Sequence, residues 1–102
     1  MKIPKSFILM GQPIEVVFDN ELCHSHNALG YCDYNHNKIV LSKTVIENTK
    51  TTRLPKAKIE QCFFHELAHM LLYLMGEEKL GGNEKFVDVL GSLIYQFNIT
   101  KK

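Results

Sequence analysis

The sequence has little cysteine, no long hydrophobic run and no excess of either charge. Three cysteines cannot all pair within one chain, which favours a reduced, cytoplasmic protein over a disulfide-stabilised secreted one. The longest apolar run, from Met70 to Met75, is far shorter than the roughly 18 residues that a membrane span needs, so we expect no membrane contact. Lys plus Arg total 12 and Asp plus Glu total 11, a near balance that argues against a dedicated nucleic-acid binder.

Length and composition predict one folded domain over residues 1–102. Hydrophobic residues make up 45% of the chain and charged residues 23%, as in ordinary globular proteins, which excludes intrinsic disorder. The first half of the chain is typical of strands, because Ile14, Val16 and Phe18 recur with a period of two. Strands are expected at residues 7–10, 14–18, 30–34 and 38–42. A loop or a short irregular piece is expected at residues 19–29, and residues 44–54 fit either a strand or a helical turn.

The second half of the chain predicts two helices. Pro55 can open a helix without losing a hydrogen bond, and the apolar residues after it recur at helical spacing as far as Met75. Gly76 is suited to end this helix, and Asn83 is suited to cap a second one that continues to about Phe97. Strands followed by helices favour an α+β fold, in which a small, mainly antiparallel sheet of three or four strands packs on the two helices.

The most informative segment is His65-Glu66-Leu67-Ala68-His69, an H-E-x-x-H sequence within the long predicted helix. Residues i and i+4 share one helix face, so both histidines can direct a ring nitrogen at one ion, for which imidazole suits Zn²⁺. Glu66 is rotated by about 100° around the helix, which places its carboxylate beside the metal. Glu66 is therefore the candidate general base that takes a proton from the attacking water.

A third metal ligand must come from elsewhere, because catalytic zinc typically has three protein ligands and one position for water. The metzincin continuation is excluded, since Leu72 and Met75 stand where that class has Gly and His. The remaining candidates are Glu77, Glu78, Glu84 and Asp88. Glu84 has the best expected geometry, because it opens the second helix, which can fold back across the first.

The expected face of the second helix continues beyond Glu84. Asp88 lies one turn later, where it can accept a hydrogen bond from the second ring nitrogen of a ligand histidine. Gly91 follows on the same face and would let the two helices approach closely. The same face ends at Tyr95.

The segments His65–His69 and Asn83-Glu84-Lys85-Phe86-Val87-Asp88 together resemble the gluzincin clan of zinc metallopeptidases. In that clan a helix after H-E-x-x-H supplies a glutamate, often within N-E-x-x-x-D, and this second sequence is complete here. At this length the chain is similar to minimal gluzincins (minigluzincins), to small phage-encoded metallopeptidase-like proteins and to ImmA/IrrE-like proteins. The resemblance implies that His65, His69 and Glu84 bind one Zn²⁺ ion, with Glu66 as the general base.

The resemblance also implies how a substrate is bound. In these families an extended peptide lies along the edge strand before the zinc helix, here within residues 30–34 or 38–42, where proline substitutions should weaken substrate binding. Larger gluzincins add a C-terminal subdomain that steadies the oxyanion, and the sequence shows no counterpart of it. The residues that could replace that donor are His24, His26, His36, Tyr31, Tyr34 and Tyr95.

Two further groups of residues have plainer interpretations. A second metal site is one reading of Cys23, His24, His26, Cys32 and His36, but their spacing matches no compact zinc motif and favours loop residues. A small buried side chain is the simplest role for Cys62. The basic stretch that contains Lys43, Lys50, Arg53, Lys56 and Lys58 fits a solvated face, with a nucleic-acid or acidic-partner contact as the alternative.

The sequence thus predicts a zinc-dependent metallopeptidase that acts on a peptide or protein substrate. The first alternative is a zinc-bound regulatory or interaction module of the same fold with little or no peptidase activity, and the second is a binding protein with structural zinc. Glu66 separates these functions, because only a hydrolase has an evident use for a carboxylate at that position.

Overall fold

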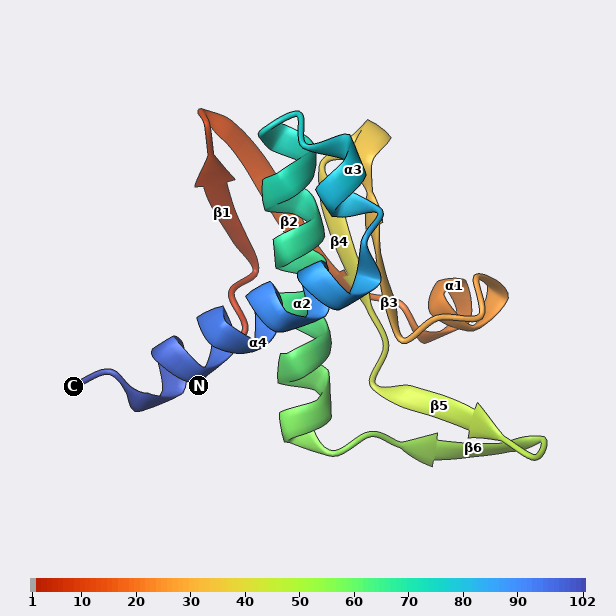
Figure 1. Cartoon of the computed structure of the whole chain (residues 1–102). Helices are drawn as coiled ribbons and strands as arrows, with labels where there is room; N and C mark the ends of the chain where they lie inside the picture. Colours follow the sequence, from red (N-terminus) through yellow and green to blue (C-terminus); the bar gives the residue numbers. More distant parts are fainter. Residues whose placement is uncertain (1) are drawn as a thin grey trace.

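The computed structural model describes residues 2–102, so Met1, the first residue of the expected domain, lies outside the described part. The elements in chain order are β1 (Ser6–Leu9), β2 (Gln12–Phe18), α1 (Asn20–Ser25), β3 (Gly30–Asp33), the short 3-10 helix η1 (Tyr34–His36), β4 (Lys38–Leu41), β5 (Thr44–Glu47), β6 (Lys50–Arg53), α2 (Lys56–Leu74), α3 (Glu78–Gly81) and α4 (Glu84–Thr100). In Figure 1 the long helix α2 lies over the main sheet, and α4 crosses in front of α2. The hairpin of β5 and β6 extends away from this body.

The main sheet has the strand order β1-β2-β4-β3. Two of its pairings, β1 with β2 and β3 with β4, are antiparallel, whereas β2 and β4 run parallel with Val16 opposite Ile39. The sheet is therefore mixed but mainly antiparallel, and the predicted α+β class is confirmed. This order leaves β3 at one edge of the sheet, where Cys32 on β3 contacts Glu66 on α2.

Hydrophobic burial explains why the strands pair in this way. Ile14 and Val16 are buried on β2, while Glu15 between them is exposed, as the period of two predicted. The central strand β4 is buried along Ile39, Val40 and Leu41. Ile39 and Leu41 belong to the core shared with α2, and Val40 points to the opposite face of the sheet. The core between the sheet and α2 consists of Ile14, Val16, Ile39, Leu41, Phe63, Phe64 and Met70.

The long helix α2 has the predicted boundaries to within a residue. Pro55, at φ −60°, stands just before its first turn, and Gly76 follows its end at φ +75°, a conformation that glycine adopts without strain. No helix within residues 2–102 is both long and apolar enough to span a membrane. All three cysteines, Cys23, Cys32 and Cys62, are unpaired thiols in the described chain.

Several short elements differ from the expectation. Residues 19–29 are not all loop, because the Asp19 carboxylate accepts a hydrogen bond from the Leu22 N–H at 3.0 Å and caps the short helix α1. The ambiguous residues 44–54 form the β5–β6 hairpin, whose turn places Asn48 and Thr49 at positive φ. The expected connection after Gly76 contains the short helix α3, and α4 continues three residues beyond Phe97.

The two long helices cross at Gly91, as the sequence predicted. A Cβ atom at Gly91 would lie 2.8 Å from the main-chain oxygen of Phe64 and 3.1 Å from the main-chain nitrogen of His65. Contacts this short with backbone atoms are not relieved by a side-chain rotation, so only glycine allows the observed separation of α2 and α4. Val87 on α4 is fully buried against Ala68 and Leu72 of α2 and extends this contact toward the start of α4.

We predict that Gly91→Ala lowers the free energy of unfolding by about 1–3 kcal/mol, because the added methyl group forces α4 away from α2. Gly81→Ala is the matched control, since its new Cβ would meet only the Leu72 Cβ at 3.8 Å, an ordinary contact. Urea denaturation of both variants measures the difference. Equal stability of Gly91→Ala and the wild type would show that the helix crossing accommodates a methyl group without a steric clash.

Candidate metal centre

Three side chains from two helices meet at the crossing of α2 and α4. His65 and His69 lie one turn apart on α2. The planes of their rings make an angle of 71°, an edge-to-face arrangement, and the ring centroids are 4.9 Å apart. Glu84 on α4 places Oε2 3.2 Å from Nε2 of His65 and Oε1 3.3 Å from Nε2 of His69. One ligand atom from each of the three residues lies within 4.8 Å of the others, so this group could hold a metal ion.

The three side chains lie close enough together to share one ion. Glu84 reaches the two histidine nitrogens through its two different oxygens, with Oε2 3.2 Å from His65 and Oε1 3.3 Å from His69. Two imidazole nitrogens and one carboxylate oxygen are also a donor set that catalytic zinc uses.

Local structure places Glu84 in this group. The Asn83 side chain accepts a hydrogen bond from the Phe86 N–H at 3.1 Å and thereby begins α4 immediately before Glu84. Gly91, two turns later, brings α4 against the part of α2 that carries His65. The Asn83 cap determines where α4 begins, and Gly91 determines how closely α4 approaches α2. Glu84 needs both to reach the histidines.

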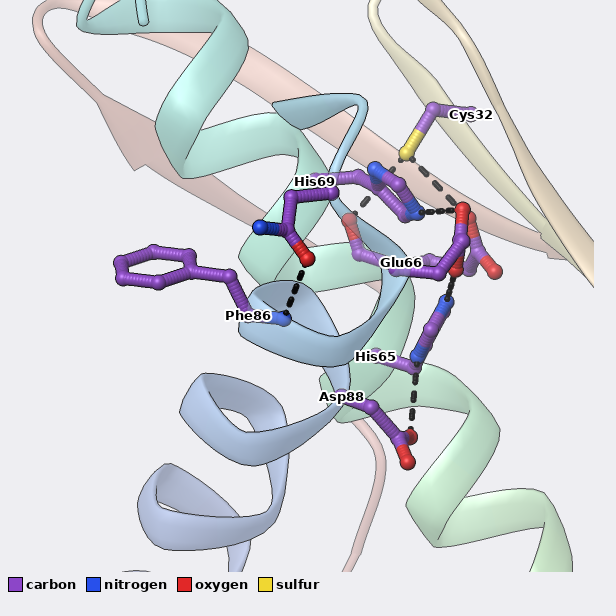
Figure 2. A network of polar contacts seen from close by, with 8 residues as sticks. Cys32, His65, Glu66, His69, Phe86 and Asp88 are labelled. Carbon is purple, nitrogen blue, oxygen red and sulfur yellow. Dashed lines mark hydrogen bonds and ion pairs between the residues drawn. The ribbon is translucent and has the colours of Figure 1, made fainter. Parts of the chain in front are cut away.

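Asp88 lies on the other side of His65. Its Oδ1 is 3.3 Å from Nδ1 of His65, while Nε2 of the same ring faces Glu84 (Figure 2). A ring that donates its Nδ1 proton to Asp88 is in the tautomer that leaves the Nε2 lone pair available for a metal. The structure thus places Asp88 beside His65 and outside the ligand group itself.

Glu66 lies beside the group without joining it. Only 9% of Glu66 is exposed, and Figure 2 shows its side chain between the two histidines and β3. Burial raises the pKa of the Glu66 carboxyl, while the nearby His65 and His69 and a hydrogen bond from Cys32 act in the opposite direction. A buried carboxylate next to a candidate metal site is suited to exchange protons with a water molecule there.

Sequence reasoning did not associate Cys32 with Glu66. The Cys32 thiol on β3 contacts Glu66 at its main-chain oxygen, 3.1 Å from Sγ, and at Oε1, 3.6 Å from Sγ. These residues are 34 positions apart, so no local spacing signals the contact. The only sequence signal is that both belong to segments expected to pack together, the last strands and the zinc helix.

The other candidate ligands do not converge within residues 2–102. Glu77 and Glu78 are exposed and lie outside the ligand group, in the connection after α2. The ring of His24 contacts Thr44, the ring of His26 stacks on Tyr31, and the ring of His36 pairs with Asp33. The described residues therefore contain one metal-ligand group, and the alternative of a second site gains no support.

Two clefts flank the ligand group. The first has a volume of about 430 Å³ and contains His65, Glu66 and Asp88 on its wall, next to Gly30 of β3. The second has a volume of about 550 Å³ and contains His69 together with the stacked rings of Tyr34 and Tyr73, whose centroids are 4.2 Å apart. The candidate metal centre is thus open to solvent from both sides along the edge strand.

A helix with H-E-x-x-H, a glutamate from a second helix and a preceding sheet define a module of the zinc metallopeptidase type. Comparison with protein families agrees, because residues 11–101 match the SprT-like family, which is a minigluzincin-type, zinc metallopeptidase-like family. The chain therefore belongs to the SprT-like family. No curated protein and no solved structure gives a significant match.

We predict that Glu84→Ala weakens zinc binding by more than about 100-fold, because it removes a ligand, whereas Asp88→Ala weakens it by about 10- to 100-fold through the orientation of His65. Glu77→Ala is the control, since it removes an equal charge outside the ligand group. Zinc affinity is measured by competition with a chromophoric chelator, and stoichiometry by native mass spectrometry. Wild-type affinity in Glu84→Ala would require a different third ligand.

Proposed function

We propose that the protein is a zinc-dependent metallopeptidase that hydrolyses peptide bonds in a peptide or protein substrate. The observation that carries this proposal is the convergence of His65, His69 and Glu84 next to the buried carboxylate of Glu66. Structural zinc sites are normally closed by four protein ligands, whereas this group offers three within the described chain. A fourth position for water and an adjacent proton acceptor are what hydrolysis needs.

Each side chain has a distinct part in the proposed reaction. A bound zinc ion would polarise the scissile carbonyl and lower the pKa of the attacking water. Glu66 accepts the proton of that water and delivers it to the nitrogen of the leaving amine, which balances the hydrolysis. Asp88 holds His65 in the tautomer that ligation requires, through the 3.3 Å contact with Nδ1.

The edge strand β3 offers the main-chain groups that would bind an extended substrate. The Leu29 carbonyl accepts a hydrogen bond from the Ser42 N–H, and this pairing continues into the antiparallel ladder of β3 and β4. Because hydrogen-bonded pairs alternate along such a ladder, the N–H and C=O groups of Gly30 and Cys32 point away from β4. A substrate that adds to this edge would pass Glu66 between the two flanking clefts.

Tyr34 is the proposed donor to the oxyanion. Among the six candidates, Tyr34 and Tyr95 line clefts that also contain a ligand histidine. The Tyr95 hydroxyl donates to the carboxylate of Glu60 at 2.7 Å, whereas the Tyr34 hydroxyl bonds to the sulfur of Cys32. Sulfur is the weaker acceptor, so Tyr34 is the easier of the two to release, which favours it for this role. Burial raises the pKa of the Tyr34 hydroxyl, so it keeps its proton and remains a donor near neutral pH.

We further propose a cytoplasmic location and kinship with ImmA/IrrE-like proteins. A cytoplasmic location is supported by the three cysteines, none of which is paired within the described chain. Kinship with ImmA/IrrE-like proteins is supported by the order of elements, a small sheet followed by the H-E-x-x-H helix.

We predict that Glu66→Gln lowers kcat for a cleaved peptide by about 10²- to 10⁴-fold, because the amide cannot accept the proton of the water. Zinc stoichiometry stays at the wild-type value, since Glu66 is not in the ligand group. Peptide cleavage and native mass spectrometry on the same samples measure both. A wild-type protein that binds zinc but cleaves no peptide from a broad library would favour the regulatory module instead.

We predict that N-methylation of single amides along a cleaved peptide raises KM by about tenfold at alternate positions, because each methyl group that faces β3 removes one hydrogen bond. The intervening positions are the matched controls, since those amides point away from the edge strand. A methyl scan across the residues around the scissile bond measures the pattern. Equal effects at all positions, or none, would rule out pairing with β3.

A further inference from the structure

Cys32 contacts the proposed general base from the neighbouring strand. Its Sγ lies 3.1 Å from the main-chain oxygen and 3.6 Å from Oε1 of Glu66, and Figure 2 shows the thiol directed at the glutamate. An ionised glutamate can only accept hydrogen bonds, so it depends on neighbouring donors to fix its carboxylate. Within residues 2–102 the hydrogen bond to the Glu66 carboxylate comes from Cys32.

The chemical state of the thiol suits a donor. Burial, followed by the nearby Glu66 carboxylate, raises the pKa of Cys32 well above its usual value. The thiol therefore keeps its proton at neutral pH and is a poor nucleophile and a poor metal ligand, both of which require the thiolate. This agrees with the absence of Cys32 from the ligand group in the described chain.

We propose that Cys32 is a positioning residue for peptide hydrolysis, whose S–H group holds Oε1 of Glu66 so that Oε2 faces the attacking water. The inference rests on the proposed role of Glu66 as general base. The S–H group carries one proton for two acceptors on Glu66, and the charged carboxylate is the stronger acceptor when it is ionised.

The neighbouring residues of β3 support this arrangement. A Cβ at Gly30 would lie 3.4 Å from Cγ of Glu66 and 3.0 Å from Cδ2 of Leu41, so β3 passes close to the Glu66 side chain there. The Glu66 side chain is thus bounded by Gly30 and by Cys32, two residues apart on the same strand. Rotation of the carboxylate away from the observed position is restricted on this side.

Cys32 lies on the edge strand β3, so its main chain and its side chain face different partners. The main-chain groups of Cys32 are among those that point away from β4, toward the place proposed for the substrate. One residue would then bind the substrate through its main chain and orient the base through its side chain. Cys32 would then set the distance between the scissile bond and Glu66, a distance on which catalysis by proximity depends.

Cys32→Val and Cys32→Ser test this role as a pair. Valine fills a similar volume without a donor, so kcat should fall by about tenfold with KM within about twofold and zinc affinity unchanged. Serine restores a donor, so kcat should return to within about threefold of the wild type. Cys23→Ala is the control, because within residues 2–102 this buried cysteine on α1 belongs neither to the metal-ligand group nor to the hydrogen bonds of Glu66, and it should leave kcat unchanged.

The infrared S–H stretching band gives a readout that does not depend on turnover. The Cys32 band is identified as the one lost in Cys32→Ser, and hydrogen bonding should place it below the bands of Cys23 and Cys62. Glu66→Gln should shift this band, because an amide oxygen replaces the carboxylate acceptor. A Cys32 band that ignores Glu66→Gln, or wild-type kcat in Cys32→Val, would overturn the proposal.

Failure of the inference is distinct from failure of the proposed function. A wild-type protein that cleaves peptides while Cys32→Val retains full kcat refutes the role of Cys32 alone. A wild-type protein that cleaves no peptide refutes the peptidase function and the catalytic role of Cys32 with it. In that case the infrared band still establishes whether the thiol is bonded to Glu66.

Discussion

The approach of α4 to α2 at Gly91 is the constraint on which the metal centre depends. A side chain at this position would meet backbone atoms of Phe64 and His65, so the helices reach their observed separation only with glycine there. His65 and His69 share a helix and meet without help from the tertiary fold, but Glu84 arrives from a second helix. The position of Glu84 therefore depends on the packing between the two helices. The buried Val87 contributes to that packing.

The charges at the helix crossing favour a cation there. The carboxylates of Glu66 and Glu84 lie near one another, and Asp88 adds a further negative charge at His65. Like charges at short range destabilise a folded protein, most strongly where one of them is buried, as Glu66 is. A divalent cation between the histidines and Glu84 would offset this repulsion, and its binding would then stabilise the fold.

The local parts of the fold and site follow from the sequence, whereas the long-range parts do not. The bounds of α2 follow from Pro55 and Gly76, and the start of α4 from Asn83, because caps and helix periodicity are local signals. The pair of His65 and His69 follows from helix geometry alone. Each of these depends on residues within a few positions of one another.

Three features of the fold have no local signal in the sequence: the β5–β6 hairpin, the pairing of β2 with β4, and the contact of Cys32 with Glu66. The hairpin of β5 and β6 turns at Thr49 with φ 64°, a conformation that β-branched residues rarely adopt, so turn chemistry did not predict it. The parallel pairing of β2 with β4 and the contact of Cys32 with Glu66 join residues far apart in the chain. Tertiary packing decides both, which is why a thiol next to the candidate base becomes visible only in the structure.

The central claim is that one zinc ion is held by two histidines and one glutamate, and X-ray absorption at the zinc edge of the loaded protein tests it most directly. The account predicts nitrogen and oxygen neighbours at about 2.0–2.1 Å, with the outer-shell scattering of two imidazole rings. A neighbour at about 2.3 Å would be sulfur and would place a cysteine in the site, which contradicts the account.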